Sequence, residues 1–305
     1  MIRLTGLIAA TFTPMDEEGN VNQAPVPAMV DYLLAQGVRG LYVCGSTGEG
    51  PSLTTEERES VAEAFVRAAA GRLPVVVQVG HNSVEDARRL AAHAAHIGAD
   101  AFSAKPPTYF KPDSMAVLVE TVGHIADAAP GLPFYYYHIP RLSGVVVDVP
   151  EFLAAASSRI PRLAGVKFSH FELDMLQRCR ALDGGRYNVL FGMDEQLLSG
   201  YAAGCEGAVG STYNFLARLY NDVIRNFEKG NIDAARQGQL KAAGIIRILL
   251  RFHGLSGIKA AMTFAGVACG PTRLPLTRLS AAEIDALRHA LDVAGFFEYA
   301  SPHAL

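Results

Sequence analysis

The chain has 305 residues, of which 50% are hydrophobic, and a formal net charge of -3. This length supports one large α/β domain or two smaller ones, and the near-balanced charge argues against a nucleic-acid or membrane-surface partner. No apolar stretch is long enough to span a bilayer, and the first apolar run is too short for a signal peptide. The four cysteines form no Cys-x-x-Cys pair, so we expect a cytoplasmic protein without structural zinc.

Short apolar runs alternate with longer amphipathic segments over the first 230 residues or so. Continuous apolarity is typical of parallel strands that are covered on both faces. Eight runs have this character: residues 7–12, 40–44, 74–79, 101–104, 132–137, 163–168, 189–192 and 207–210.

Helical segments separate these runs. Thr54, followed by acidic residues, predicts an N-cap and a helix that continues to about residue 70. Ser83 opens a second helix, which Gly98 ends. Further helices are expected at residues 113–129, 149–158, 172–182 and 195–203. This order predicts a (β/α)8 barrel, and the alternative is an open doubly wound sheet, although no Gly-x-Gly-x-x-Gly follows any strand.

No strand pattern follows residue 215 or so. Helices are expected at residues 216–228, 232–250, 255–264 and 281–291, and the first of these completes the barrel. We therefore expect the barrel to occupy residues 1–230, with residues 231–305 forming a helical extension packed on it.

Lys167 closes the sixth apolar run, in a chain with 6 lysines, 21 arginines and no lysine before Lys105. Desolvation disfavours the ammonium form of a buried lysine, so its amine can act as a nucleophile. Such an amine suits Schiff-base formation with a carbonyl substrate. The alternative is a structural lysine at a strand end, whose ammonium group reaches water.

Other polar residues also follow predicted strands, at the end of the barrel where active sites are built. The loop Gly45-Ser-Thr-Gly-Glu-Gly50 lacks the ending of a P-loop. Its hydroxyl and N–H groups suit a carboxylate, and the alternative is a plain tight turn. Tyr137 shares a strand face with Tyr135, and its phenol suits proton transfer beside a lysine; the alternative is an aromatic core strand. Asp194 and Glu195 either bind polyol hydroxyls or start a helix.

Several motifs together resemble the dihydrodipicolinate synthase / N-acetylneuraminate lyase family, over essentially the whole chain. They are Gly45-Ser-Thr-Gly-Glu49, Tyr135-Tyr-Tyr-His-Ile-Pro140, Gly165-Val-Lys-Phe-Ser169, Phe191-Gly-Met-Asp-Glu195 and Gly207-Ala-Val-Gly-Ser-Thr-Tyr-Asn214. The resemblance implies a (β/α)8 barrel, a class I Schiff-base mechanism without a metal or other cofactor, and a homotetramer.

The resemblance also implies a role for each matching residue. Lys167 forms the imine with a 2-oxo acid, and Tyr137 moves the proton of the hydroxyl at the breaking bond. Ser46 and Thr47 hold the substrate carboxylate, and Ser46 relays protons to Tyr137. Tyr109 matches a position from which some relatives send a tyrosine into a neighbouring subunit. The groove for the sugar is lined by Ser169, Gly192, Asp194, Glu195 and Ser211.

Leu142 stands where the synthase branch of the family has an arginine. The resemblance therefore favours the lyase branch, which cleaves N-acetylneuraminate to pyruvate and N-acetylmannosamine. His170 stands where lyases commonly have an aspartate, so we expect it to tune the sugar pocket or its support. The alternatives are an aldolase for a related 2-oxo sugar acid, a dihydrodipicolinate synthase, or a non-catalytic barrel that binds sugar acids. The last needs neither Lys167 nor Tyr137.

Overall fold

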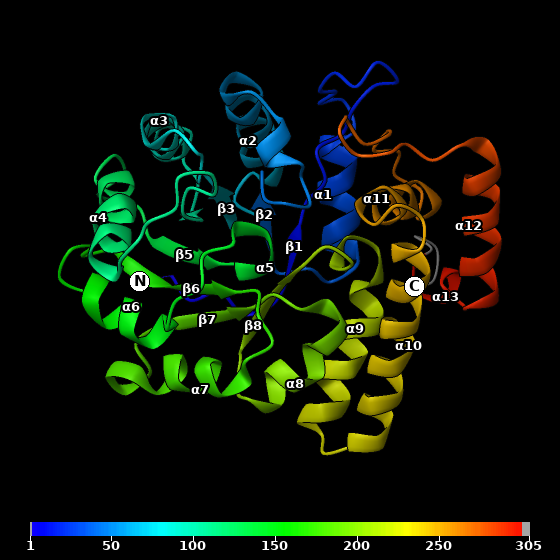
Figure 1. The fold of residues 1–305 in the computed structure, drawn as a ribbon. Coiled ribbons are helices and arrows are strands. Elements are labelled where there is room, and N and C mark those ends of the chain that lie inside the picture. Colours follow the sequence, from blue (N-terminus) through cyan, green and yellow to red (C-terminus); the bar gives the residue numbers. More distant parts are fainter. Residues whose placement is uncertain (1, 301–305) are drawn as a thin grey trace.

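The computed structural model describes residues 2–300, and its centre is a closed barrel of parallel strands (Figure 1). Each strand pairs with the next along the chain, and the first pairs with the last. The predicted (β/α)8 barrel is confirmed, and each strand end lies within about two residues of its prediction. The strands are β1 Gly6–Ala10, β2 Gly40–Val43, β3 Val75–Gln78, β4 Ala101–Ala104, β5 Phe134–His138, β6 Leu163–Phe168, β7 Asn188–Phe191 and β8 Gly207–Gly210.

Helices surround the barrel between successive strands. Thr54 and Glu57 form a complete capping box, and the Ser83 hydroxyl accepts a hydrogen bond from the Asp86 N–H, so both predicted helix starts are confirmed. The expected helix at residues 195–203 is split, because a 3-10 turn, η3 Asp194–Gln196, precedes α8. The α-helices are α1 Val26–Ala35, α2 Thr55–Ala69, α3 Val84–His96, α4 Met115–Ala126, α5 Pro140–Ser143, α6 Val149–Ala156, α7 Leu173–Ala181, α8 Leu197–Ala202 and α9 Tyr213–Glu228.

Four further helices follow: α10 Ile232–Leu250, α11 Leu255–Phe264, α12 Ala281–Val293 and α13 Phe297–Ala300. They lie together on one side of the barrel, where α10 and α13 contact α9 (Figure 1). The helical extension was expected to reach residue 305, but residues 301–305 lie outside the described part of the chain. Within residues 2–300, no helix combines the length and apolarity that a membrane crossing needs.

Strand alternation fills the barrel with a distinct interior cluster. It contains Tyr42, Tyr135 and Tyr137, together with smaller apolar residues from the other strands. The pairing of β5 with β6 skips Ala164, since Phe134 pairs with Leu163 and Tyr135 with Gly165. Gly165 fits here because a Cβ would lie 1.9 Å from the Asn188 carbonyl oxygen. Beyond this bulge, Tyr137 pairs with Lys167. The register therefore places these two residues side by side at the carboxyl ends of their strands.

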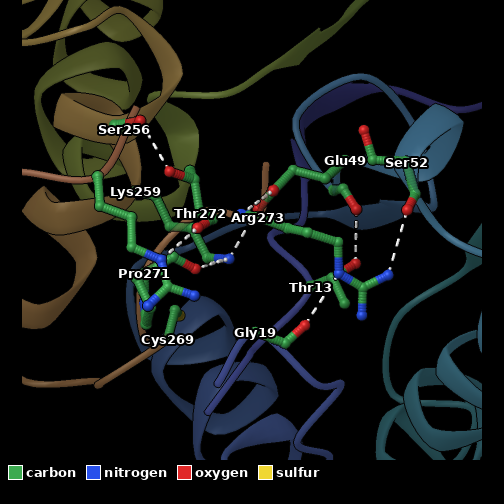
Figure 2. A network of polar contacts seen from close by, with 12 residues as sticks. Thr13, Gly19, Glu49, Ser52, Ser256, Lys259, Cys269, Pro271, Thr272 and Arg273 are labelled. Carbon is green, nitrogen blue, oxygen red and sulfur yellow. Dashed lines mark hydrogen bonds and ion pairs between the residues drawn. The ribbon is translucent and has the colours of Figure 1, made fainter. Parts of the chain in front are cut away.

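The loop between β2 and α2 is fixed to the helical extension by a buried ion pair (Figure 2). The Lys259 ammonium, on α11, lies 2.7 Å from the Glu49 carboxylate, and their side chains are 1% and 0% exposed. The Arg273 N–H donates to the other Glu49 oxygen at 2.8 Å. Burial lowers the pKa of Lys259, while Glu49 opposes that shift. Because both charges are removed from water, each needs the other.

We expect Lys259→Met to lower the free energy of unfolding by about 3–5 kcal/mol, because it leaves the Glu49 carboxylate buried without its counter-charge. Lys241→Met is the matched control. It breaks a pair of the same 2.7 Å length with Glu298, but there the side chains are 31% and 62% exposed, so its cost should be about 0–1 kcal/mol. Urea denaturation measures both values, and equal costs would contradict the role assigned to burial.

Candidate functional site

Lys167 lies at the end of the barrel interior between two aromatic rings. Its side-chain nitrogen is 3.9 Å from the ring centroid of Tyr42 and 4.2 Å from that of Tyr137. The two rings meet edge to face, with centroids 5.7 Å apart. The Tyr42 hydroxyl donates to Ser103 Oγ at 2.9 Å, which fixes that ring. Within residues 2–300, no carboxylate approaches Lys167 closely enough to form an ion pair. The lysine is 4% exposed, and its side-chain nitrogen lies over the faces of two aromatic rings, a geometry that attracts cations.

Polar residues also follow other strands at the end of the barrel where Lys167 lies. Thr47 Oγ1 lies 2.7 Å from Ser211 Oγ, so the β2 loop and the end of β8 are in contact. Ser169 is buried two residues after Lys167. Gly192 packs against it so closely that a Cβ would lie 2.0 Å from Ser169 Oγ. The sequence thus predicted correctly that these residues follow strands at one end of the barrel.

Asp194 and Glu195 are adjacent in the chain but have different environments. Asp194 is buried, and its Oδ2 accepts hydrogen bonds from the N–H and the hydroxyl of Thr212, both at 2.7 Å. Burial raises the pKa of Asp194 to about 6, although these hydrogen bonds oppose the shift. Glu195 is exposed. Asp194 therefore joins β7 to β8, whereas the Glu195 carboxylate is available to a ligand.

The helical extension also supports this part of the site. Gln239, on α10, donates to the Asp194 carbonyl oxygen at 3.2 Å and accepts from the Leu198 N–H at 2.9 Å. The 3-10 turn η3 and the start of α8 are thus connected to α10 through one side chain. The position of Asp194 depends on residues far along the chain.

The residues that alternate with the interior set lie outside the barrel. Tyr136 stacks on Phe152 of α6, with ring centroids 4.2 Å apart. His170 stacks on Phe171 at 4.4 Å and contacts the ring of His138 at 5.5 Å. Burial, assisted by the charge of His170, lowers the pKa of His138 to about 4. His170 therefore belongs to an outer aromatic cluster behind β5 and β6.

Tyr109 is not brought to the Lys167 site within a single chain. It is 79% exposed and meets Phe110 edge to face, with ring centroids 5.0 Å apart. The backbone N–H groups of Thr108 and Tyr109 both donate to the Asn82 side chain, which holds the loop in place. The exposed aromatic pair is thus presented outward on an anchored loop.

Sequence reasoning missed Tyr42 and the Glu49–Lys259 pair, and it assigned no role to Thr212 at the end of β8. Tyr42 was detectable, because it lies near the end of β2, shortly before the Gly45–Gly50 loop. Strand alternation turns its side chain to the face opposite Leu41 and Val43. The ion pair was not, since its two residues are 210 positions apart. Among residues 2–300, no cluster of three or more histidines, cysteines or acidic residues is arranged to hold a metal ion.

A closed parallel barrel with polar side chains gathered at the carboxyl ends of its strands defines a (β/α)8 protein of the enzyme type. Comparison of its sequence with known families narrows this class to one family. Residues 3–294 match the model of the dihydrodipicolinate synthetase family. The chain belongs to this family.

Similar proteins extend over nearly the whole chain. N-acetylneuraminate lyase A of Xenopus laevis is 44% identical over 278 residues, which cover 90% of this chain and 91% of that protein. The solved N-acetylneuraminate lyase (sialic acid aldolase) of Aliivibrio salmonicida is 41% identical, with a TM-score of 0.94 and coverage of 97% and 98%. A sialic acid aldolase of Ruminococcus gnavus, solved as a catalytic lysine mutant, is 31% identical, with a TM-score of 0.90 and coverage of 96% of each chain.

The raised pKa of Asp194 predicts a measurable dependence of stability on pH. The folded protein binds this proton more tightly than the unfolded chain, so its stability decreases as the pH rises through the interval between the two pKa values. A shift from 3.8 to about 6 corresponds to about 3 kcal/mol. Asp194→Asn removes the titration, so the variant should gain about 3 kcal/mol relative to the native protein between about pH 4 and pH 7.

Denaturation at a series of pH values measures this difference. Asp16→Asn is the control, because hydrogen bonds with Asn20 lower the pKa of the half-buried Asp16. Its difference from the native protein should therefore change in the opposite direction with pH. If the free energies of unfolding of the native protein and Asp194→Asn changed in parallel with pH, the raised pKa of the buried Asp194 carboxyl would be contradicted.

Proposed function

We propose that this protein is a class I carbon–carbon lyase that cleaves N-acetylneuraminate to pyruvate and N-acetylmannosamine. The observation that carries the proposal is the position of Lys167, whose amine lies buried beside the Tyr137 ring at the end of the barrel interior. The names of the relatives support the substrate, and the catalytic lysine of the Ruminococcus gnavus aldolase supports the lysine chemistry.

In the proposed reaction, the Lys167 amine attacks the carbonyl carbon C2 of the open-chain sugar acid. Loss of water, with one proton supplied by the Tyr137 hydroxyl, gives a protonated imine, and no other cofactor takes part. The C3–C4 bond then breaks, and its electron pair moves into the imine to give an enamine. The Tyr137 phenolate accepts the proton of the C4 hydroxyl, which becomes the aldehyde of N-acetylmannosamine. Protonation of the enamine at C3 and hydrolysis release pyruvate and restore the amine.

The other predicted residues are proposed to hold the substrate. Ser46 and Thr47 bind its carboxylate, with Ser46 relaying protons to Tyr137. Thr47 and Ser211 already share a contact, which supports a single polar surface from β2 to β8. The sugar is proposed to lie along Ser169, Gly192, Asp194, Glu195 and Ser211. Of the two acids, exposed Glu195 is the better candidate for direct contact with sugar hydroxyls, while Asp194 supports the groove.

We further propose a homotetramer in which Tyr109 contributes to a neighbouring subunit's site. The exposure of the Tyr109–Phe110 pair supports an interface, because aromatic residues are enriched in interfaces. Light scattering would measure the assembly. The four cysteines are buried and unpaired, which supports a cytoplasmic location. The division at residue 230, with a catalytic barrel and a supporting extension, is likewise a proposal that the Glu49–Lys259 pair supports.

Reduction with borohydride in the presence of pyruvate should attach a stable adduct to Lys167, and mass spectrometry of its peptide measures this. Lys105 is the competing amine, because it is half-buried at the end of β4 and burial lowers its pKa to about 8. We expect Lys167→Ala to abolish the adduct and the release of pyruvate from N-acetylneuraminate. Lys105→Ala should retain both. An adduct on Lys105, or faster turnover of aspartate semialdehyde than of N-acetylneuraminate, would refute the proposal.

Tyr137→Phe should lower kcat by about 100-fold or more, because it removes only the hydroxyl that transfers the proton. The borohydride adduct on Lys167 should persist in this variant. Tyr135→Phe is the matched control: its hydroxyl donates to Asn188 at 2.9 Å, deeper in the same interior cluster. It should leave kcat nearly unchanged. Near-native turnover by Tyr137→Phe would assign the proton transfer to another group.

A further inference from the structure

The Gly45–Gly50 loop has a front side and a back side. On the front, Thr47 contacts Ser211 at the site described above. On the back, the Glu49 carboxylate is turned into the protein and is fully buried. Within the loop, the Glu49 N–H donates to the Ser46 carbonyl oxygen at 3.1 Å, and the Gly50 N–H donates to that of Gly45 at 3.0 Å. The hydrogen bond from Glu49 to Ser46 therefore closes a turn that contains Thr47 and Gly48.

The backbone at Glu49 is left-handed, with a φ of 55°. A residue with a Cβ adopts this conformation only at an energetic cost, so the surrounding contacts must maintain it. At the next position only glycine fits, because a Cβ on Gly50 would lie 2.0 Å from the Cys44 carbonyl oxygen. On the other side, Thr13 Oγ1 donates to the Gly48 carbonyl oxygen at 2.6 Å. The loop is thus held in one conformation from several directions.

The groups that hold Glu49 come from the helical extension (Figure 2). Lys259 donates to Glu49 and also to the Pro271 carbonyl oxygen, both at 2.7 Å. Arg273 donates its backbone N–H to Glu49, while its guanidinium binds both Glu57 carboxylate oxygens at 2.6 and 2.7 Å. Since Glu57 belongs to the first turn of α2, Arg273 holds both the Glu49 side chain and the helix that follows the loop.

We propose that Glu49 is a positioning residue for the subsite of the substrate carboxylate, and that Lys259 and Arg273 hold it for that task. The buried charges fix the loop so that Ser46 and Thr47 present their hydroxyl and N–H groups at one place. This inference rests on the proposed function, because it assigns the carboxylate of a 2-oxo acid to that loop. Glu49 itself touches neither the substrate nor the amine of Lys167.

Two carbonyl compounds separate this role from a merely structural one. Pyruvate carries the carboxylate, whereas acetone has a methyl group in its place, and both form an imine with a reactive lysine. For Glu49→Gln, the pyruvate concentration that gives half-maximal borohydride trapping of Lys167 should rise by about 10- to 100-fold, the scale of a misplaced binding group. The corresponding acetone concentration should stay within about twofold, because Lys167 is untouched.

Glu298→Gln, which breaks the exposed pair with Lys241, is the matched control and should change neither value. If Glu49→Gln fails to fold, Glu49→Gln/Lys259→Met removes both buried charges and should show the same selective loss of pyruvate. An equal loss with pyruvate and acetone, or no loss with either, would overturn the inference. If borohydride attached no pyruvate to Lys167 of the native protein, that result would instead refute the proposed function.

Discussion

The closure of the parallel barrel is the constraint on which the rest of the structure depends. Every strand must pair on both sides, so its register is fixed by two neighbours at once. The bulge at Ala164 is accommodated within that closed ring, and Tyr137 then pairs with Lys167. Strand alternation turns the side chains of Tyr137 and Lys167 into the barrel. It turns those of His138 and Phe168 outward. The pairing of Lys167 with Tyr137 inside the barrel and the aromatic cluster outside it are therefore two results of one register.

Much of this arrangement follows from the sequence. The strands were predictable because each is a short apolar run. The helices α10 and α11 were predictable because the sequence after β8 has a helical and not a strand pattern. Lys167 and Tyr137 were predictable because they end such runs. The burial of Asp194 was not predictable, since an acidic pair at a helix start looks the same whether or not Thr212 is there to bind it. Nor was the partner of Glu49, because only the packing of the extension brings Lys259 to it.

The extension does more than cover one side of the barrel. Through Lys259 and Arg273 it contacts the loop after β2, and through Gln239 it contacts the turn after β7. The loop after β2 carries Ser46 and Thr47, and the turn after β7 carries Asp194 and Glu195. Residues remote in the chain thus hold in place two of the segments that follow strands at this end of the barrel.

The two rings beside Lys167 also affect how its nitrogen can move. A carboxylate holds an ammonium group through directed N–H bonds, whereas the face of a ring attracts a cation with little preference among directions. When an amine becomes an imine, its nitrogen changes from tetrahedral to planar and loses hydrogens. Between the faces of Tyr42 and Tyr137, that change breaks no directed contact. The two ring faces are thereby compatible with both geometries that the nitrogen would adopt in the proposed imine formation.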